Sequence, residues 1–219
     1  MTTLSIRSVV AVAVGALVLA TGAPAAAQPE YPPLSAAEAD AGRGAARDYI
    51  AAARGRDGAA AARLVSRETR AYYARLAAMA VSAPEAQVRA APLMERIMIL
   101  MYRHRVPATE LRALAGDAAF AYTIDKGWVT EDAEDDPDLS ALQVYGGDDR
   151  AILRDGDEEL HFIREDGGWR WDMMPTILAA STALAPDPDS EMTEDEFVMF
   201  ILEYSDGRDP SPDIWQPLP

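Results

Sequence analysis

The sequence contains no cysteine, and it contains little lysine and little histidine. Among its 219 residues there are two histidines and a single lysine, Lys126, so 19 of the 20 cationic side chains are arginine. A chain without cysteine forms no disulfide, no cysteine nucleophile and no cysteine-ligated zinc site. Two histidines are too few for a multi-histidine metal site, and there is no glycine-rich phosphate loop and no Gly-x-Ser-x-Gly elbow. We therefore expect no metal and no cofactor.

Positive charge is scarce as well. Twenty Lys and Arg residues stand against 36 Asp and Glu residues, which gives a formal net charge of −16. Such an acidic chain repels phosphate backbones, so we expect no nucleic-acid partner. Residues 28–130 hold 14 basic and 11 acidic side chains, whereas residues 131–219 hold 5 and 25. This asymmetry predicts a cationic face on the first half and an acidic face on the second.

Long hydrophobic runs are missing too. The longest, residues 9–20, has twelve residues and is interrupted by Gly15, whereas a membrane span needs about 20. Arg7 precedes this run, and three alanines ending at Ala27 follow it, a pattern typical of a secretory signal peptide. We predict cleavage after Ala27, which gives a periplasmic or secreted protein with no membrane attachment after cleavage. The alternative is a retained N-terminal anchor.

The rest of the chain divides into a leader (residues 28–34), a domain (35–185) and a C-terminal part (186–219) with an acidic linker, a helix and a Pro-rich tail. Ser35 and Ser66 are placed as helix N-caps. Helices are predicted over residues 35–54, 59–65, 67–81, 85–105, 109–115 and 118–126. A capping box at Thr193 and Glu196 opens the C-terminal helix, with Phe197, Phe200, Ile201 and Tyr204 on one side.

From Leu139 the apolar period changes to two, which indicates β-strands. Asp166-Gly167 is a strong hairpin signal between the last two strands. The predicted strands are residues 142–145, 150–153, 159–164 and 169–173. Helices followed by an antiparallel meander predict an α+β fold, in which N-terminal helices pack on one face of a curved sheet and a C-terminal helix is added.

Short motifs carry a family resemblance. Residues 46–50 (ARDYI), with Gly58 and residues 59–64 (AAAARL), resemble the opening helices of the nuclear transport factor 2-like superfamily, which includes ketosteroid isomerase and polyketide cyclases. Residues 162–172 (FIREDGGWRWD) resemble its last hairpin, so the resemblance spans about residues 36–180. It implies a cone-shaped fold whose enzymes use Asp, His and Tyr inside the cone, and it implies a possible homodimer through the sheet.

Other stretches are similar to uncharacterised secreted bacterial members of this superfamily. They are residues 120–122 (FAY), 126–129 (KGWV) and 214–218 (IWQPL). This similarity extends to the C-terminus but implies no activity, because one fold hosts unrelated functions.

The hairpin predicts which residues face each other across the last two strands. A turn at Asp166-Gly167 pairs Phe162 with Trp171, Leu160 with Met173 and His161 with Asp172. His161 and Asp172 are therefore the candidate catalytic residues, since a carboxylate that fixes an imidazole tautomer makes a general base. The alternative is a cross-strand ion pair that faces solvent.

Five residues are candidates for a small apolar pocket between helix 85–105 and the sheet: Met98, Met101, Tyr102, Trp171 and Met173. Methionine packs adaptably around ligands, although its helical spacing here equally fits an ordinary core. We therefore expect an exported soluble module that binds a small apolar ligand or a protein partner. The alternative is an isomerase, dehydratase or cyclase in which His161 and Asp172 act, with Tyr72 or Tyr122 as donor.

Two further features have a simple interpretation. The acidic residues 131–138 either bind calcium weakly or form a solvated loop, since they lack the glycine and spacing of an EF-hand. His104, between two arginines, is interpreted as a cation that suits the negative end of a helix dipole.

Overall fold

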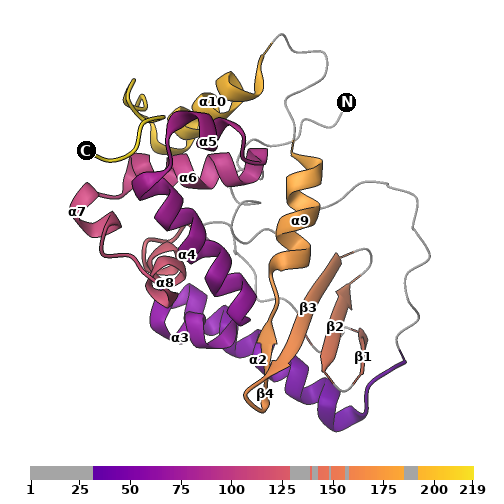
Figure 1. Cartoon of the computed structure of the whole chain (residues 1–219). Coiled ribbons are helices and arrows are strands. Elements are labelled where there is room, and N and C mark those ends of the chain that lie inside the picture. Colours follow the sequence, from indigo (N-terminus) through magenta and orange to yellow (C-terminus); the bar gives the residue numbers. More distant parts are fainter. Residues whose placement is uncertain (1–31, 129–138, 140–142, 148, 156–157, 185–191) are drawn as a thin grey trace.

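A computed structural model describes residues 32–128, 139, 143–147, 149–155, 158–184 and 192–219 (Figure 1). The predicted signal peptide, its cleavage site and the acidic residues 131–138 lie outside the described residues. No helix within the described part of the chain has the length and apolar character that crossing a membrane requires.

The first half of the described chain is helical. Its helices are α2 (Ala36–Arg54), α3 (Gly58–Leu64), α4 (Arg67–Ser82), α5 (Glu85–Arg89), α6 (Leu93–Arg105), α7 (Ala108–Leu111) and α8 (Asp117–Asp125). Ser35 and Ser66 cap α2 and α4, as predicted, by accepting hydrogen bonds from backbone N–H groups three residues on. The helical stretch predicted over 85–105, where Pro92 could start a helix or produce a kink, forms two helices, because Pro92 is the N-cap of α6.

The strands are β1 (Gln143–Gly146), β2 (Arg150–Asp155), β3 (Glu158–Glu165) and β4 (Gly168–Trp171), in the antiparallel order β1-β2-β3-β4. The predicted meander and α+β class are confirmed. The predicted pairing of Phe162 with Trp171 is also confirmed. Asp166 and Gly167 have φ values of 51° and 77°, the left-handed conformation that suits a two-residue hairpin turn.

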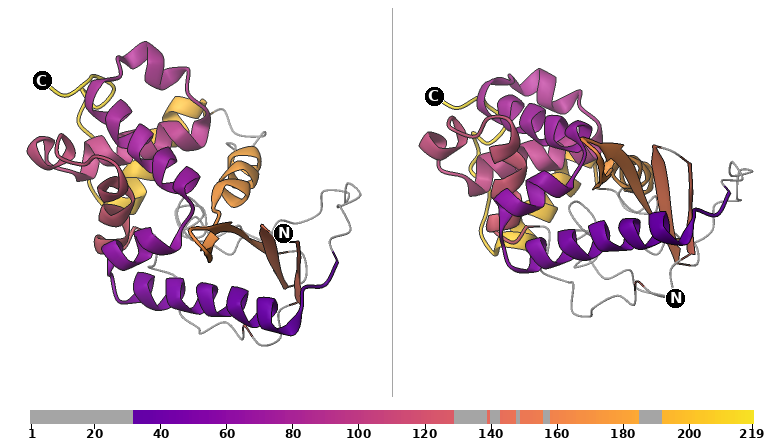
Figure 2. Two further views of the ribbon diagram at one scale, coloured as in Figure 1. Left: turned by 60° about the horizontal axis from the view of Figure 1, so that its bottom comes forward. Right: turned by 90° about the horizontal axis from the view of Figure 1, so that it is seen from below.

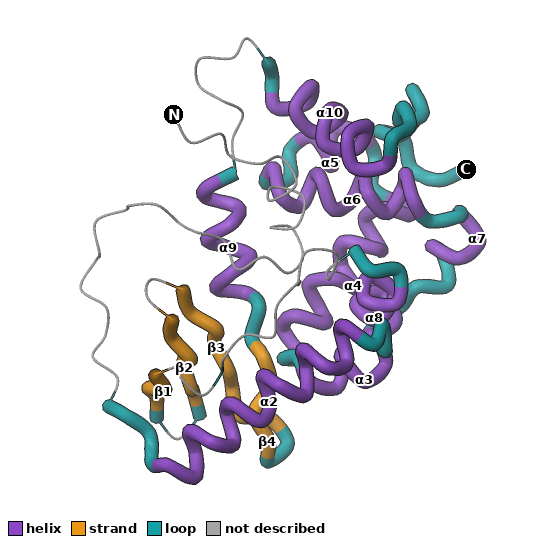
Figure 3. Tube along the Cα trace, turned by 180° about the vertical axis from the view of Figure 1, so that it is seen from behind, coloured by secondary structure: helices purple, strands orange, loops and turns teal. Residues whose placement is uncertain are grey.

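The prediction that Leu160 pairs with Met173 is wrong. Strand β4 ends at Trp171, and Met173 is the N-cap of a helix that the sequence pattern does not predict, α9 (Met174–Ala183). Met173 has a helical backbone (φ −79°, ψ −9°), and its N–H donates to Thr69 Oγ1 at 3.1 Å instead of extending the strand. Helix α9 contacts both β3 and α6 (Figure 3).

Helix α2 lies across one face of the sheet (Figure 2). Small residues on α2 allow a close approach: a Cβ on Gly42 would lie 3.6 Å from Leu153 Cδ1. The smaller of two apolar cores forms here, from Ala39, Ala46, Leu139, Val144, Ala151, Leu153, Phe162 and Trp169. Each edge strand carries one isolated bridge, from Pro33 to Tyr145 on β1 and from Val65 to Trp171 on β4. Such pairing satisfies edge groups that would otherwise recruit another strand.

The larger core lies among α4, α6 and α8, on the other side of the molecule from the sheet (Figure 1). Its most deeply buried large side chains include Tyr73, Leu76, Met94, Met98, Leu100, Tyr102, Phe120 and Ile124. Burial of this much apolar surface is the main source of stability in a chain that has no disulfide.

Helix α10 (Glu194–Asp206) packs on α6, and both halves of the predicted capping box at Thr193 and Glu196 are present. The prediction that Phe197, Phe200, Ile201 and Tyr204 form the apolar side of this helix is only partly correct. Its buried residues are Val198, Ile201 and Leu202. Phe200 and Tyr204 instead stack on each other with centroids 6.0 Å apart, and Tyr204 is 50% exposed. Carboxylates at the start of this helix contact arginines of α5 and α6.

Candidate functional site at the junction of helices and sheet

Trp171 joins the two apolar cores. It is the last residue of β4, and its indole packs against both the helical core and the sheet core. The ring of Tyr49, on α2, stands edge-on to it with centroids 4.4 Å apart and an interplanar angle of 82°. The backbone N–H of Ser66 donates to the Trp171 carbonyl at 2.8 Å, which fixes the end of β4 against the start of α4.

Polar atoms at this junction lack hydrogen-bond partners. The Tyr49 hydroxyl and Trp171 Nε1 are both buried and unpartnered. Burial raises the pKa of Tyr49 well above its usual value, so this hydroxyl stays a neutral donor. Leaving a buried donor unpaired costs about 1–3 kcal/mol, and proteins normally satisfy such a group with protein, water or a ligand. Tyr49 and Trp171 therefore present two donors from contacting rings.

Four of the five predicted pocket residues are enclosed by protein. Met98 and Met101 are 1% exposed, Tyr102 is 0% exposed and Met173 is 4% exposed. The Tyr102 hydroxyl donates to the Ala119 carbonyl at 2.9 Å, so its polar end is already satisfied. Trp171 is partly exposed. All five belong to, or pack against, the same helical core, and Trp171 is the member that reaches the molecular surface.

His161 and Asp172 keep their opposite positions, but their side chains have different partners. The Asp172 N–H donates to the His161 carbonyl at 2.8 Å, which continues the predicted register one residue beyond β4. His161 Nε2 lies 3.3 Å from Glu159 Oε2 on its own strand. Burial lowers the pKa of His161, against the opposing effect of Glu159 and Asp172. The imidazole is therefore neutral at neutral pH.

Asp172 is 8% exposed and belongs to a buried polar network. Its Oδ1 accepts from Ser66 Oγ at 3.3 Å and from the Met174 N–H at 3.2 Å. The Ser66 and Thr69 hydroxyls are 2.9 Å apart. This network ties the end of β4 to the first turns of α4 and α9, so Asp172 positions the segment that carries Trp171.

Sequence reasoning missed Tyr49, Ser66 and Thr69 as parts of this site. Ser66 was recognised as an N-cap, but nothing local indicates its bond to Asp172, 106 residues away. Tyr49 is the one aromatic residue of α2, which is a usable signal in a helix of mostly small side chains. Its contact with Trp171 depends on how α2 crosses the sheet, and the sequence pattern does not specify that crossing.

The other aromatic and histidine candidates lie elsewhere. The Tyr122 hydroxyl donates to Glu110 Oε2 at 3.1 Å, and burial together with this carboxylate raises the pKa of Tyr122 to about 12. Tyr72 lies under the Arg75 guanidinium, 5.2 Å from its ring centroid. His104, interpreted above as a cation at the negative end of a helix dipole, has a side chain only 5% exposed beside Asp206.

No family model, curated protein or solved structure matches this chain. Within the ranges that the structure describes, no three His, Asp or Glu residues are grouped to hold a metal ion. The feature that bears most directly on function is the junction itself, where two unpaired donors lie among apolar side chains.

Proposed function

We propose that the protein is an exported binding module that takes a small, largely apolar ligand beside Trp171, where the helical core meets the sheet. The observation that carries this proposal is the pair of buried, unpartnered donors, Tyr49 Oη and Trp171 Nε1, on two rings in edge contact. Acceptor oxygens of a bound ligand would supply the partners that the protein itself does not provide. Such sites are typically apolar, with a few convergent polar atoms that orient the ligand.

The surroundings define the chemistry of this ligand. Both donors are neutral. Val65, which bridges to Trp171, and Met173, two residues further along the chain, are apolar and at most 4% exposed. A bare carboxylate pays a large desolvation cost in such an environment unless a cation pairs with it. The site therefore favours a neutral acceptor such as a carbonyl, hydroxyl or ether oxygen on an apolar molecule.

Export and family membership form part of the same proposal. The basic start, the apolar run and the small residues before Gln28 support a signal peptide and a periplasmic or secreted location. Helices followed by an antiparallel meander, with α2 across one sheet face, support a nuclear transport factor 2-like fold. A homodimer through the sheet remains a proposal from that resemblance.

The test is native mass spectrometry of the chain purified from a bacterial periplasm. We expect an added mass that is lost on denaturation, and we expect Met98→Ala and Trp171→Ala to lower its occupancy. Leu178→Ala is the matched control, because this apolar side chain is 68% exposed on α9. If the two core variants retain the wild-type occupancy while remaining folded, the ligand site does not lie at the junction.

A second candidate function is an isomerase, dehydratase or cyclase that uses His161 and Asp172. The observation that favours this enzyme is the position of His161, whose neutral imidazole belongs to the residue opposite the buried Asp172 in the strand register. The discriminating experiment incubates any co-purified ligand with the protein in heavy water. Deuterium incorporation that His161→Gln abolishes supports proton abstraction, whereas bound ligand without incorporation supports the binding module.

A further inference from the structure

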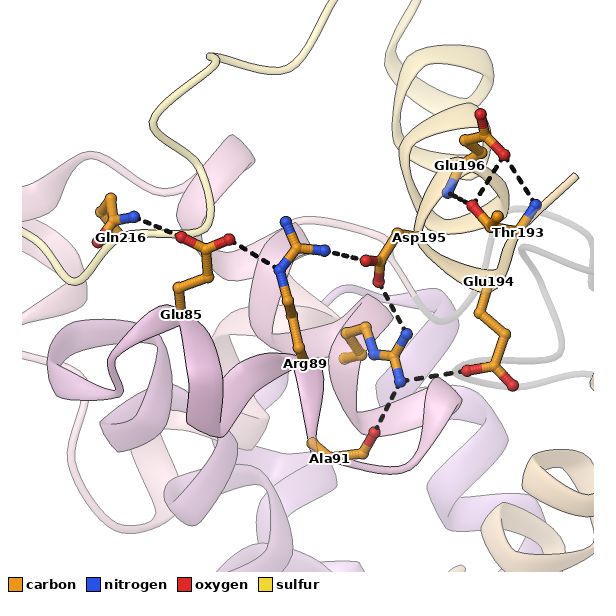
Figure 4. Close-up of polar contacts among 9 residues, drawn as sticks. Glu85, Arg89, Ala91, Thr193, Glu194, Asp195, Glu196 and Gln216 are labelled. Atoms are coloured by element: carbon orange, nitrogen blue, oxygen red, sulfur yellow. Dashed lines mark hydrogen bonds and ion pairs between the residues drawn. The ribbon is translucent and has the colours of Figure 1, made fainter.

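The C-terminal segment, residues 192–219, is fastened to the helical core by charged groups at the start of α10. Asp195 contacts Arg89 (Figure 4). Asp195 and Glu194 both contact Arg96 as well. Arg96 Nη1 lies 2.9 Å from Asp195 Oδ1, and Arg96 is only 7% exposed. This buried guanidinium depends on carboxylates that belong to the segment.

The tail after α10 makes the second attachment. The Arg89 guanidinium lies 4.0 Å from the ring centroid of Trp215, and Arg103 Nη1 donates to the Ile214 carbonyl at 3.1 Å. Apolar burial supports both attachments, and the buried apolar side chains of the segment are Val198, Ile201, Leu202, Ile214 and Trp215. The Arg89–Asp195 pair is partly exposed on both sides, and such a pair adds little stability. The segment can therefore open at lower cost than the whole fold.

The third attachment encloses His104, near the end of α6. Its Nε2 lies 3.1 Å from Asp206 Oδ2 and, although buried, has no hydrogen-bond partner. Asp206 is already paired with Arg105, whose Nη2 lies 2.6 Å from Oδ1. Arg208, just beyond α10, donates to the His104 carbonyl. One carboxylate and two guanidinium groups thus surround an imidazole whose side chain is 5% exposed.

Protonation of His104 adds a third cation to this enclosed cluster. Burial, Arg208 and Arg105 lower the pKa of His104, and Asp206 opposes them. While the segment is docked, the imidazole is therefore neutral at neutral pH. When the segment moves away, Asp206 and Arg208 leave with it and water reaches the ring.

We propose that residues 192–219 form a clasp that opens as a unit in mild acid, with protonation of His104 as the trigger. The open form binds the proton more tightly than the closed form, so the equilibrium shifts toward opening as pH falls through about 6.5. Each pKa unit between the two forms is worth about tenfold in the opening constant. Opening bares the apolar surface of α6 on which Val198, Ile201 and Leu202 pack.

The absence of cysteine gives a direct test. Val198→Cys places a single thiol at a position that is 0% exposed on the inner side of the clasp, with little change in volume. Its rate of modification by iodoacetamide reports opening. The rate is measured at about pH 7.5 and about pH 5.5, a window in which histidine titrates. The same measurement in a chain that also carries His104→Gln cancels the pH dependence of the thiol chemistry itself.

We divide the modification rate measured with His104 intact by the rate measured with His104→Gln, and we expect this ratio to rise several-fold at the lower pH. His161→Gln is the matched control, because it removes the other histidine of the chain and leaves the clasp intact. Val65→Cys, also 0% exposed but outside the clasp, reports opening of the whole fold. A ratio that does not change with pH, or a parallel rise at Val65→Cys, overturns the proposal.

Amide hydrogen exchange of the unaltered chain provides a second readout that needs no introduced thiol. Peptides from residues 192–219 are expected to lose protection at the lower pH in the wild type and to keep it in His104→Gln. Peptides from α8 serve as the internal reference. Equal loss of protection in both chains, or loss throughout the molecule, contradicts a clasp controlled by His104.

Discussion

The ring of Tyr49 stands edge-on to the indole of Trp171, and this contact connects α2 to the end of β4. Elsewhere α2 presents small residues such as Ala39 and Ala46 to the sheet. Aromatic pairs in this geometry add about 0.5–1.5 kcal/mol beyond the area that they bury. Tyr49 and Trp171 therefore join the helix to the strand through two large rings, and they also hold the two unpaired donors.

Trp171→Ala removes this connection. We expect it to lower the free energy of unfolding by about 3 kcal/mol, the cost typical of removing a large aromatic side chain from a core. Urea unfolding followed by circular dichroism measures the change. A loss below about 1 kcal/mol would show that the two cores are held together by other contacts.

Tyr49→Phe is expected to have the opposite sign in the ligand-free protein. It deletes a buried, unpaired hydroxyl and keeps the ring, so the free energy of unfolding rises by about 1 kcal/mol. Tyr102→Phe is the matched control, since the Tyr102 hydroxyl does have a partner, the Ala119 carbonyl. Chemical denaturation of both variants should give changes of opposite sign, and equal destabilisation would mean that the Tyr49 hydroxyl is already satisfied.

Ser66→Ala tests the polar network that positions Trp171. Ser66 caps α4, and it also donates to the buried Asp172 carboxylate. Ser35→Ala removes an exposed cap of the same kind from α2. We expect a loss of about 2–3 kcal/mol for Ser66→Ala and about 1 kcal/mol for Ser35→Ala. Thermal and urea unfolding measure both losses. Equal losses in the two variants would mean that Ser66 acts only as a helix cap and that its bond to Asp172 adds no stability.

Stability is expected to fall in mild acid because of the two histidines. Burial is the main cause that lowers the pKa of both His104 and His161 in the folded protein. When the pKa of a histidine is lower in the folded protein than in the unfolded chain, the neutral imidazole contributes to the free energy of unfolding above about pH 6.5. This contribution is lost as pH falls through the pKa of the folded protein. We expect the free energy of unfolding to decrease between about pH 7.5 and 5.5, and the double variant His104→Gln/His161→Gln to flatten this decrease. If the double variant shows the same decrease in the free energy of unfolding as the wild type, carboxylates and not histidines cause that decrease.

Local signals in the sequence were sufficient for much of this fold. The caps Ser35, Ser66 and Thr193 follow from short-range hydrogen bonding, and the hairpin register follows from the turn at Asp166-Gly167. These features depend on residues within a few positions of each other. For the same reason the α+β class and the meander could be predicted from the apolar period and the turn residues.

Features set by long-range contacts could not be predicted in this way. Helix α9 has no charged residue in its first or last turn, and its N-cap Met173 makes no capping side-chain bond, so its start depends on where Met173 docks against Thr69. The pairing of Tyr49 with Trp171 and the burial of His104 against Asp206 each join segments about a hundred residues apart. Periodicity identifies which faces are apolar, but it does not specify which faces meet.

The most direct measurement of ligand binding at the junction compares the wild type with Tyr49→Phe by native mass spectrometry, both purified from a periplasm. The wild type should carry a small molecule that is released on denaturation. Loss of one buried hydrogen bond should lower the occupancy in Tyr49→Phe by about tenfold, although that variant is at least as stable. A wild-type protein without added mass, or equal occupancy in the two chains, would contradict a ligand held by Tyr49 and Trp171.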